Sequence, residues 1–272
     1  MAVPDVSVII TTRNEENNIV ACLESARKQT YPAEKIELII VDNNSKDKTK
    51  ELARKYTDKV YNYGPERSAQ RNYGVRQAEG RYILYLDADM TLSMPLIAEC
   101  VGKCEKEQRI ALYIPERIIG RGFWIRVRDF ERSFYNATCI DAVRFVRKDR
   151  FLEIGGFDET LTGPEDWDFD RRIKVEGGID IINSPIYHNE GNFTLKEYLD
   201  KKLYYIQYFD QYINKWGRND PIVKKQLGFY YRYISVFIEN GKGRKLIIRP
   251  VFSFALLFLR GLVGFGYLLR KR

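Results

Sequence analysis

The sequence predicts an α/β protein built on a mostly parallel central sheet. Short, apolar, β-branched runs at residues 6–12, 36–41 and 82–86 have the length and composition of strands buried on both faces. Segments with apolar residues at helical spacing separate these runs, and the connecting loops are short. Such alternation is typical of a doubly wound sheet, with helices on both of its faces.

Each further element follows from the same two patterns. The order expected up to residue 90 is strand 6–12, a helix with Ile19, Leu23 and Ala26 on one face, strand 36–41, a helix after a polar loop at 42–49, a weak strand at 60–62, helix 66–78 and strand 82–86. The order expected after it is helix 95–107, strand 110–114, a loop and helix over 116–137, strand 143–146, a helix opening near 162, and strand 179–182.

Two carboxylates, Asp87 and Asp89, stand one residue apart where the strand at 82–86 ends. Open α/β sheets place their ligands at the carboxyl ends of their strands. Because two acids this close repel each other, we expect a cation between them, and oxygen ligands favour Mg²⁺ or Mn²⁺. A pair of solvated turn aspartates is the alternative.

Other polar groups extend this site. Asp42 follows the second strand, where an acidic group can accept hydrogen bonds from a ribose or base. The chain has no G-x-G-x-x-G and no G-x-x-x-x-G-K-[ST] motif, so a dehydrogenase or P-loop enzyme is not expected. Phosphates would be held by the metal and by Arg67 or Arg71, whose alternative role is a solvated helix face.

The helix expected near residue 162 opens with four acids, Glu165, Asp166, Asp168 and Asp170. Complementarity to the helix macrodipole accounts for one or two of them. A carboxylate held at the rim of a cleft is a suitable general base. His188, the only histidine of the chain, falls in a polar loop after the last expected strand, where a structural role and a metal-ligand role both stay open.

Four blocks of the sequence resemble the inverting nucleotide-sugar glycosyltransferases of family 2. They are residues 8–15, 41–49, 71–74 with 86–89, and 155–158 with 165–168. The resemblance implies a GT-A fold over residues 1–193. It also implies a metal-dependent hexosyltransferase that uses GDP-mannose or a UDP-sugar.

The resemblance also implies a role for each matching residue. Asp166 would be the catalytic base, with Glu165 and Trp167 on the acceptor side. Mn²⁺ or Mg²⁺ would be held by Asp89, Asp87 and His188. The residues implied on the nucleotide-sugar side are Thr11, Arg13, Glu15, Asp42, Asn44, Arg67, Arg71 and Asp87.

The C-terminal region, residues 194–272, is aromatic and basic. Residues 200–272 hold 15 Lys and Arg against 4 Asp and Glu, although the whole chain carries only +8. An apolar stretch at about 246–269 is interrupted by Arg260, which would cost about 2.5–3.5 kcal/mol at the centre of a membrane span. We therefore expect two short interfacial helices hinged near Gly261, with Arg260 reaching lipid headgroups. A single span, a buried helix and a dimer interface are the alternatives.

These features predict a monotopic enzyme on the cytoplasmic face of the cell membrane, acting in polysaccharide or glycolipid synthesis. Its expected partners are a nucleotide-sugar donor, a lipid-linked or glycolipid acceptor and anionic lipid, but no nucleic acid. A nucleotidyltransferase is a second possibility, but residues 12–15 are not the Gly-rich basic loop that it needs. A non-catalytic membrane- or nucleic-acid-binding module would leave the acidic motifs without a role.

Overall fold

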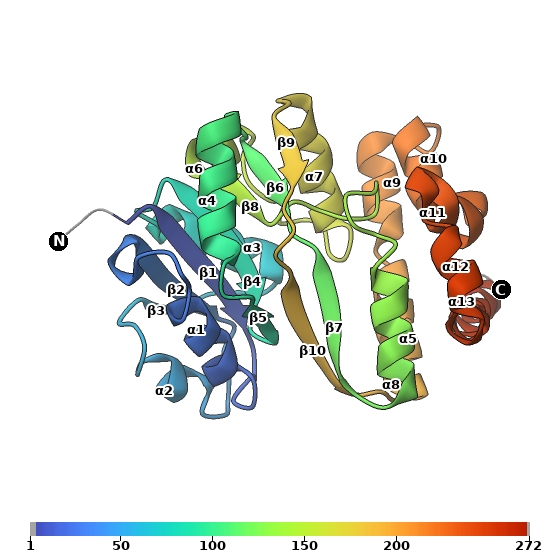
Figure 1. Cartoon of the computed structure of the whole chain (residues 1–272), viewed down its shortest axis with the longest axis horizontal. Coiled ribbons are helices and arrows are strands. Elements are labelled where there is room, and N and C mark those ends of the chain that lie inside the picture. Colours follow the sequence, from blue (N-terminus) through green and yellow to red (C-terminus); the bar gives the residue numbers. More distant parts are fainter. Residues whose placement is uncertain (1–3, 271–272) are drawn as a thin grey trace.

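A seven-stranded mixed sheet organises the N-terminal part of the chain, in the order β3-β2-β1-β4-β8-β6-β9 (Figure 1). The computed structural model describes residues 4–270. The strands of this sheet are β1 (Val6–Thr12), β2 (Ile36–Asp42), β3 (Val60–Asn62), β4 (Tyr82–Asp87), β6 (Ala111–Tyr113), β8 (Phe145–Arg147) and β9 (Ile179–Ile181). Strands β1 to β4 pair in parallel, as predicted, whereas β8 runs antiparallel to both β4 and β6.

Helices cover both faces of this sheet, as the doubly wound prediction requires. Alternate residues of β1 serve the two sides: Val8 and Ile10 pack against one face with Leu23 of α1, while Ile9 packs against the other with Val75 of α3. The helices of this part are α1 (Ile19–Arg27), α2 (Thr49–Ala53), α3 (Arg67–Gln77), α4 (Leu96–Glu107), α5 (Phe123–Arg132), α6 (Lys148–Glu153) and α7 (Glu165–Val175).

A second sheet of three strands stands beside the carboxyl end of β4. Its order is β5 (Met90–Leu92), β10 (Ile186–Asn192) and β7 (Glu116–Arg121), with β10 antiparallel to β5 and parallel to β7. The loop predicted around His188 is therefore wrong, because His188 lies on β10 opposite Met90. The loop predicted from residue 116 is wrong for the same reason, since β7 begins there. Both β7 and β10 contain many polar residues, so they lack the alternation of apolar and polar residues from which a strand is predicted.

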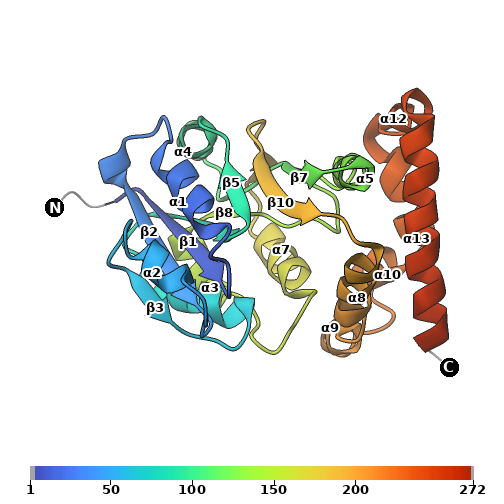
Figure 2. The same cartoon turned by 90° about the horizontal axis from the view of Figure 1, so that it is seen from below.

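The C-terminal region is helical and packs against α5. Its elements are α8 (Leu195–Ile206), α9 (Phe209–Trp216), α10 (Pro221–Leu227), a π-helical turn (Tyr231–Ser235), α11 (Val236–Ile238), α12 (Arg244–Ile248) and α13 (Pro250–Arg270). Figure 2 shows α13 as a long rod at the outer edge of the molecule. Leu256 and Leu259 of α13 are buried in a cluster with Phe130 and Phe134. The boundary proposed at residue 193 stays a prediction.

The predicted hinge near Gly261 is wrong, because α13 runs unbroken from Pro250 to Arg270. Arg260 does not reach outward either: it is 7% exposed, and its Nη2 lies 2.9 Å from Glu131 Oε1 on α5. The buried Glu131 carboxylate thus compensates the charge of Arg260, which has no acidic neighbour in the sequence. Within residues 4–270, no helix is both long and apolar enough to cross a membrane. Residues 1–3 and the basic pair 271–272 lie outside the described part.

Candidate active site

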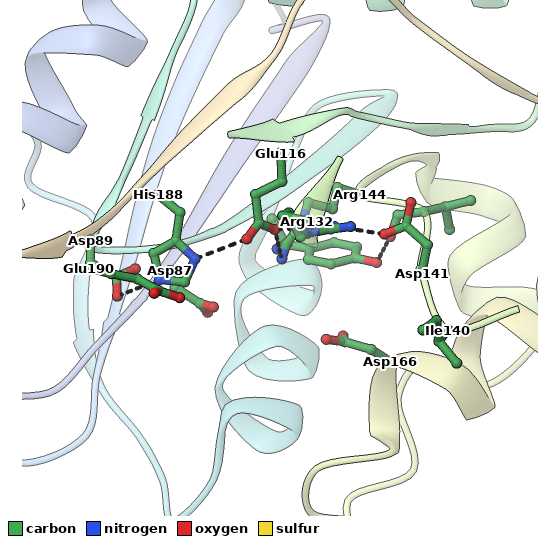
Figure 3. A network of polar contacts seen from close by, with 12 residues as sticks. Asp87, Asp89, Glu116, Arg132, Ile140, Asp141, Arg144, Asp166, His188 and Glu190 are labelled. Atoms are coloured by element: carbon green, nitrogen blue, oxygen red, sulfur yellow. Dashed lines mark hydrogen bonds and ion pairs between the residues drawn. The ribbon is translucent and has the colours of Figure 1, made fainter. Parts of the chain in front are cut away.

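A cleft of about 490 Å³ opens between the carboxyl end of β4, the three-stranded sheet and the helices α5, α7 and α8. The residues predicted from the sequence that line it are Arg67, Asp87, Asp89, Asp166, Trp167 and His188. Figure 3 shows Asp89, His188 and Glu116 in one network of contacts, with Asp166 apart from them on a helix. The fold thus brings the β4 carboxylates and the acid of α7 to one cavity, although about 80 residues separate them in the chain.

Arg71 is a buried side chain that contacts an acid on each side of the cleft, Asp87 and Asp166. Its Nη2 donates to Asp87 Oδ1 at 3.1 Å and its Nη1 donates to Asp166 Oδ1 at 2.7 Å, while its side chain is 1% exposed. Asp87 also accepts from Thr11 Oγ1 at 3.0 Å, and Arg67 Nη1 lies 3.5 Å from it. Burial alone would raise the pKa of Asp87, but the charges of Arg71 and Arg67 hold that pKa well below its usual range.

His188 links Asp89 to Glu116 (Figure 3). Its Nε2 lies 3.1 Å from Asp89 Oδ2, and its Nδ1 lies 3.0 Å from Glu116 Oε1. Burial opposes the charged imidazole, but the hydrogen bonds to the two carboxylates outweigh it and raise the pKa of His188 to about 10. Arg132 and Arg144 in turn approach Glu116 Oε2, each at 3.3 Å.

The donor set around Asp89 suits a divalent ion. Within residues 4–270, no group of three or more His, Cys, Asp and Glu side chains stands ready for a metal. Asp89 Oδ1, however, is buried and has no hydrogen-bond partner among the described residues. A carboxylate oxygen without a partner, next to an imidazole whose Nε2 becomes a ligand once it loses its proton, is a donor pair that Mn²⁺ accepts. Asp87 fits less well, because arginines and Thr11 already occupy its oxygens.

The other residues predicted on the nucleotide side lie beside the cleft, not on it. Thr11, Arg13, Glu15, Asp42 and Asn44 are absent from the described residues that line the cavity. Thr11 and Asp42 lie instead at the carboxyl ends of β1 and β2, and Arg13, Glu15 and Asn44 lie in the two interlocked loops that follow these strands. Asp42 is fully buried and accepts from Ser45 N at 2.9 Å, whereas Arg13 and Asn44 are exposed.

These two loops are held together by hydrogen bonds between backbone and side chain. Asn14 N donates to Ser45 Oγ at 2.7 Å, and Glu15 N donates to Thr49 Oγ1 at 2.8 Å. Asn14 and Asn44 have φ angles of 55° and 54°, a conformation that asparagine tolerates better than most residues. The loops thus form a preformed rim next to the end of the cleft where Asp87 lies.

The four acids of α7 have different surroundings. Asp166 lines the cleft, and Glu165 is buried behind it with Oε1 3.5 Å from Arg67 Nη2. Burial, reinforced by the neighbouring Asp166 charge, raises the pKa of Glu165. Asp168 and Asp170 serve the fold: Asp168 accepts from Trp216 Nε1 at 2.9 Å, and Asp170 accepts from the Tyr113 hydroxyl at 2.6 Å.

Trp167, predicted on the acceptor side, lines the cleft next to Asp166. Its Nε1 donates to the Ile140 carbonyl at 3.2 Å, and the Arg232 guanidinium lies 5.6 Å from its ring centre. The predicted stacking on sugar or acceptor stays a prediction.

Several residues of the cleft were missed from the sequence. They are Glu116, Arg128, Arg132, Arg144, Lys202 and Arg232. Glu116 contacts His188 only because β7 and β10 pair in register, with Ile186 opposite Glu116. No local spacing signals a contact between two residues that are 72 positions apart in the chain.

Comparison with known proteins places this chain in a family. The family model described as Glycosyl transferase family 2 matches residues 7–160, which is more than half of the chain. The minor teichoic acid biosynthesis protein GgaB of Bacillus subtilis is 38% identical over 181 residues, covering 60% of this chain and 20% of GgaB. Poly(ribitol-phosphate) beta-N-acetylglucosaminyltransferase TarS of Staphylococcus aureus is 29% identical over 126 residues, covering 43% and 22%. The chain thus matches only about a fifth of the length of each.

Solved structures share the fold. The mannosyltransferase PcManGT of Pyrobaculum calidifontis, solved with GDP-Man and Mn²⁺, superposes with a TM-score of 0.61 at 20% identity and covers 99% of this chain and 81% of that one. A structure of TarS residues 1–349 with UDP superposes with a TM-score of 0.59 at 19% identity, covering 84% and 72%. The matched family model and the sequence blocks agree, and the chain therefore belongs to glycosyl transferase family 2.

Proposed function

We propose that the protein is a metal-dependent, inverting glycosyltransferase that moves a sugar from GDP-mannose or a UDP-sugar to a hydroxyl group of a lipid-linked or glycolipid acceptor. One observation carries this proposal. A single cleft holds Asp89 and His188 on one side and Asp166 on the other. A donor half suited to a metal and an acceptor half with a base are the two parts that this reaction needs.

In the donor half, Asp89 and His188 would hold the divalent ion, with Asp87 close by. The ion would supply Lewis-acid stabilisation of the departing nucleoside diphosphate. Arg67 lines the same side of the cleft and offers its guanidinium to that developing negative charge. Thr11 and Arg71 fix Asp87 in place, so that it can orient the ribose or the sugar.

In the acceptor half, Asp166 takes the proton of the attacking hydroxyl. The hydroxyl oxygen forms a bond to the anomeric carbon as the bond from that carbon to the diphosphate breaks, and this single displacement inverts the anomeric centre. Arg71 binds Asp166 Oδ1, while Oδ2 accepts no hydrogen bond from the described residues, and this orients the carboxylate for proton transfer through Oδ2.

The donor class is supported by related structures. PcManGT was solved with GDP-Man and Mn²⁺, and TarS with UDP and with UDP-GlcNAc. Both types of donor carry a nucleoside diphosphate, and we therefore propose one for this chain.

Calorimetric titration with UDP and GDP, each with and without Mn²⁺, tests the proposal. We expect one nucleotide to bind more tightly when Mn²⁺ is present, and Asp89→Asn to remove that dependence. Asp210→Asn, an exposed acid on α9, is the matched control and should behave as wild type. Failure of both nucleotides to bind the wild-type protein would refute the proposed function.

The C-terminal helices favour action at a membrane surface. We call the exposed apolar side chains of α12 and α13 the outer apolar face; they are Ile247, Ile248, Val251, Phe254, Leu257, Phe258 and Phe265. Ile247 is 81% and Phe254 76% exposed, whereas Leu256 and Leu259 on the opposite side of α13 are buried. Exposed Arg244, Lys245 and Arg249 adjoin this face. Apolar side chains edged by cations suit an anionic lipid surface.

We place this surface at the cytoplasmic face of the cell membrane, where the four free cysteines would stay reduced. Sedimentation with neutral and with anionic lipid vesicles tests the proposal. We expect binding to the anionic vesicles, and its loss in the double variant Phe254→Ser, Phe258→Ser. Val175→Ser, an 84% exposed valine on α7, is the control. Equal sedimentation of the double variant and the wild type would contradict the assignment.

A further inference from the structure

Lys202 of α8 lines the cleft without a carboxylate partner. Its ammonium makes no hydrogen bond or ion pair within the described part of the chain, and it lies 5.7 Å from the centre of the Tyr198 ring. The Arg128 guanidinium lies 5.1 Å from the same ring. The two cations therefore lie close together beside one aromatic side chain.

The nearby carboxylates are already shared by other cations. Glu131 pairs with both Arg128 and Arg260, and Glu190 Oε1 lies 3.1 Å from Arg128 Nη2. Among the described residues, no carboxylate lies within ion-pair distance of Lys202. This differs from the donor half, where Arg67 and Arg71 each contact two acids.

Arg232 is a second cation of the cleft without a carboxylate in contact among the described residues. Its Nη1 donates to the Gln226 carbonyl at 3.1 Å, and its guanidinium lies 5.6 Å from the centre of the Trp167 ring. Trp167 follows Asp166 directly in the chain. Arg232 therefore lies on the acceptor side of the cleft, close to the candidate base.

The electrostatics agree with a local excess of positive charge. Burial, together with the charges of Arg128 and Arg232, lowers the pKa of Lys202 to about 8, although Glu131 opposes the shift. Burial also lowers the pKa of Arg232. Uncompensated buried charge costs free energy in the unliganded protein, and a bound anion removes that cost.

We propose that Lys202 and Arg232, which lie beside the carboxylate-paired Arg128, form an anion subsite in the acceptor half of the cleft that binds the phosphate group of a phosphate-bearing acceptor. This inference rests on the proposed glycosyl transfer, because it assigns the subsite to the acceptor of that reaction. Arginine and lysine donate charge-assisted hydrogen bonds that match phosphate oxygens. A phosphate bound there anchors the acceptor beside Asp166, while the separate arginines of the donor half remain for the nucleotide.

Calorimetric titration of the full chain with farnesyl phosphate, farnesol and inorganic phosphate tests the subsite. We expect farnesyl phosphate to bind at least about tenfold more tightly than farnesol. Binding of inorganic phosphate to the same cations would show that the phosphate group suffices, and binding of farnesyl phosphate alone would show that the lipid contributes as well. Equal affinity for farnesyl phosphate and farnesol would overturn the proposal.

Variants assign the binding to these cations. Lys202→Met should weaken farnesyl phosphate binding at least about tenfold, with UDP and GDP binding unchanged. Its melting temperature should stay equal or rise, because an uncompensated charge is removed. Lys196→Met, an exposed lysine on the same helix and outside the cleft, is the matched control. Retained affinity in Lys202→Met, or a loss of nucleotide binding instead, would refute the assignment. Absence of nucleotide binding in the wild type would refute only the transferase proposal.

Discussion

Arg71 and Asp166 are joined by a 2.7 Å hydrogen bond from Nη1 to Oδ1, and the other terminal nitrogen of the same guanidinium contacts Asp87. The guanidinium is fixed against two aromatic rings, 4.9 Å from the centre of Tyr85 and 5.1 Å from that of Phe157. One planar, buried group thus sets the distance between the donor half and the candidate base. Substitutions at these three charged positions should therefore not be additive.

Arg71→Met should lower the free energy of unfolding by about 3 kcal/mol, because it leaves two partly buried carboxylates without their shared cation. Arg71→Lys keeps the charge but cannot serve both carboxylates with one rigid fork, and should lie between wild type and Arg71→Met. Urea denaturation measures both. Wild-type stability in Arg71→Met would show that this bridge does not support the fold.

Asp166→Asn should lower the rate of sugar transfer by about 10²- to 10⁴-fold, because the amide cannot accept the proton of the acceptor hydroxyl. Metal-dependent nucleotide binding should persist, since Asp166 lies in the acceptor half. Initial rates of transfer and calorimetric titration with UDP and GDP measure the two effects, with Asp210→Asn as the control. Loss of nucleotide binding instead would mean that the role assigned to Asp166 is wrong.

Glu116→Gln should weaken Mn²⁺ binding by about 10- to 100-fold. Glu116 accepts from His188 Nδ1 at 3.0 Å and so orients Nε2 toward Asp89. Electron paramagnetic resonance of free Mn²⁺ measures the affinity without any need for turnover. Glu107→Gln, at the far end of α4, is the control. Unchanged affinity in Glu116→Gln would argue against His188 as a metal contact.

The parallel core could be predicted because its strands β1, β2 and β4 are buried on both faces and therefore continuously apolar. Strand β10 could not, because several of its polar side chains line the cleft and only Ile186 is fully buried. A polar functional strand carries no alternation to detect.

The long-range ion pairs of the fold could not be predicted from the sequence either. Glu131 and Arg260 are 129 residues apart, so nothing near Arg260 in the sequence shows its partner. Asp166 and Asp89, by contrast, could be placed in one site, because the sequence blocks that contain them resemble the two halves of a family 2 glycosyltransferase site.

We expect the Asp170 carboxyl group to make the free energy of unfolding fall as the pH rises from about 4 to about 7. Burial raises the pKa of Asp170 to about 6, above its usual 3.8, although Lys174 and the Tyr113 hydroxyl oppose this. In that range the folded state binds more protons than the unfolded state, so increasing pH favours unfolding. Over this pH range, the free energy of unfolding of the wild type should fall by about 1–3 kcal/mol relative to that of Asp170→Asn. A difference independent of pH would contradict this.

Arg260→Met separates the two roles considered for this arginine. If Arg260 reached lipid headgroups, its loss would weaken vesicle binding and leave stability intact. The contact with Glu131 Oε1 at 2.9 Å predicts the opposite: a loss of about 2–4 kcal/mol of unfolding free energy, with vesicle binding retained by the folded protein. Urea denaturation and vesicle sedimentation measure the two quantities on the same preparation.

The pH dependence of that loss provides an independent check. Burial raises the pKa of Glu131, but Arg128 and Arg260 outweigh it and bring the pKa down to about 2. A carboxyl group with a lowered folded-state pKa stabilises the fold above its unfolded value, 4.5, and loses this contribution as the pH falls toward 2. The stability difference between wild type and Arg260→Met should therefore shrink on acidification. A difference that grows at low pH would show that Arg260 does not act through Glu131.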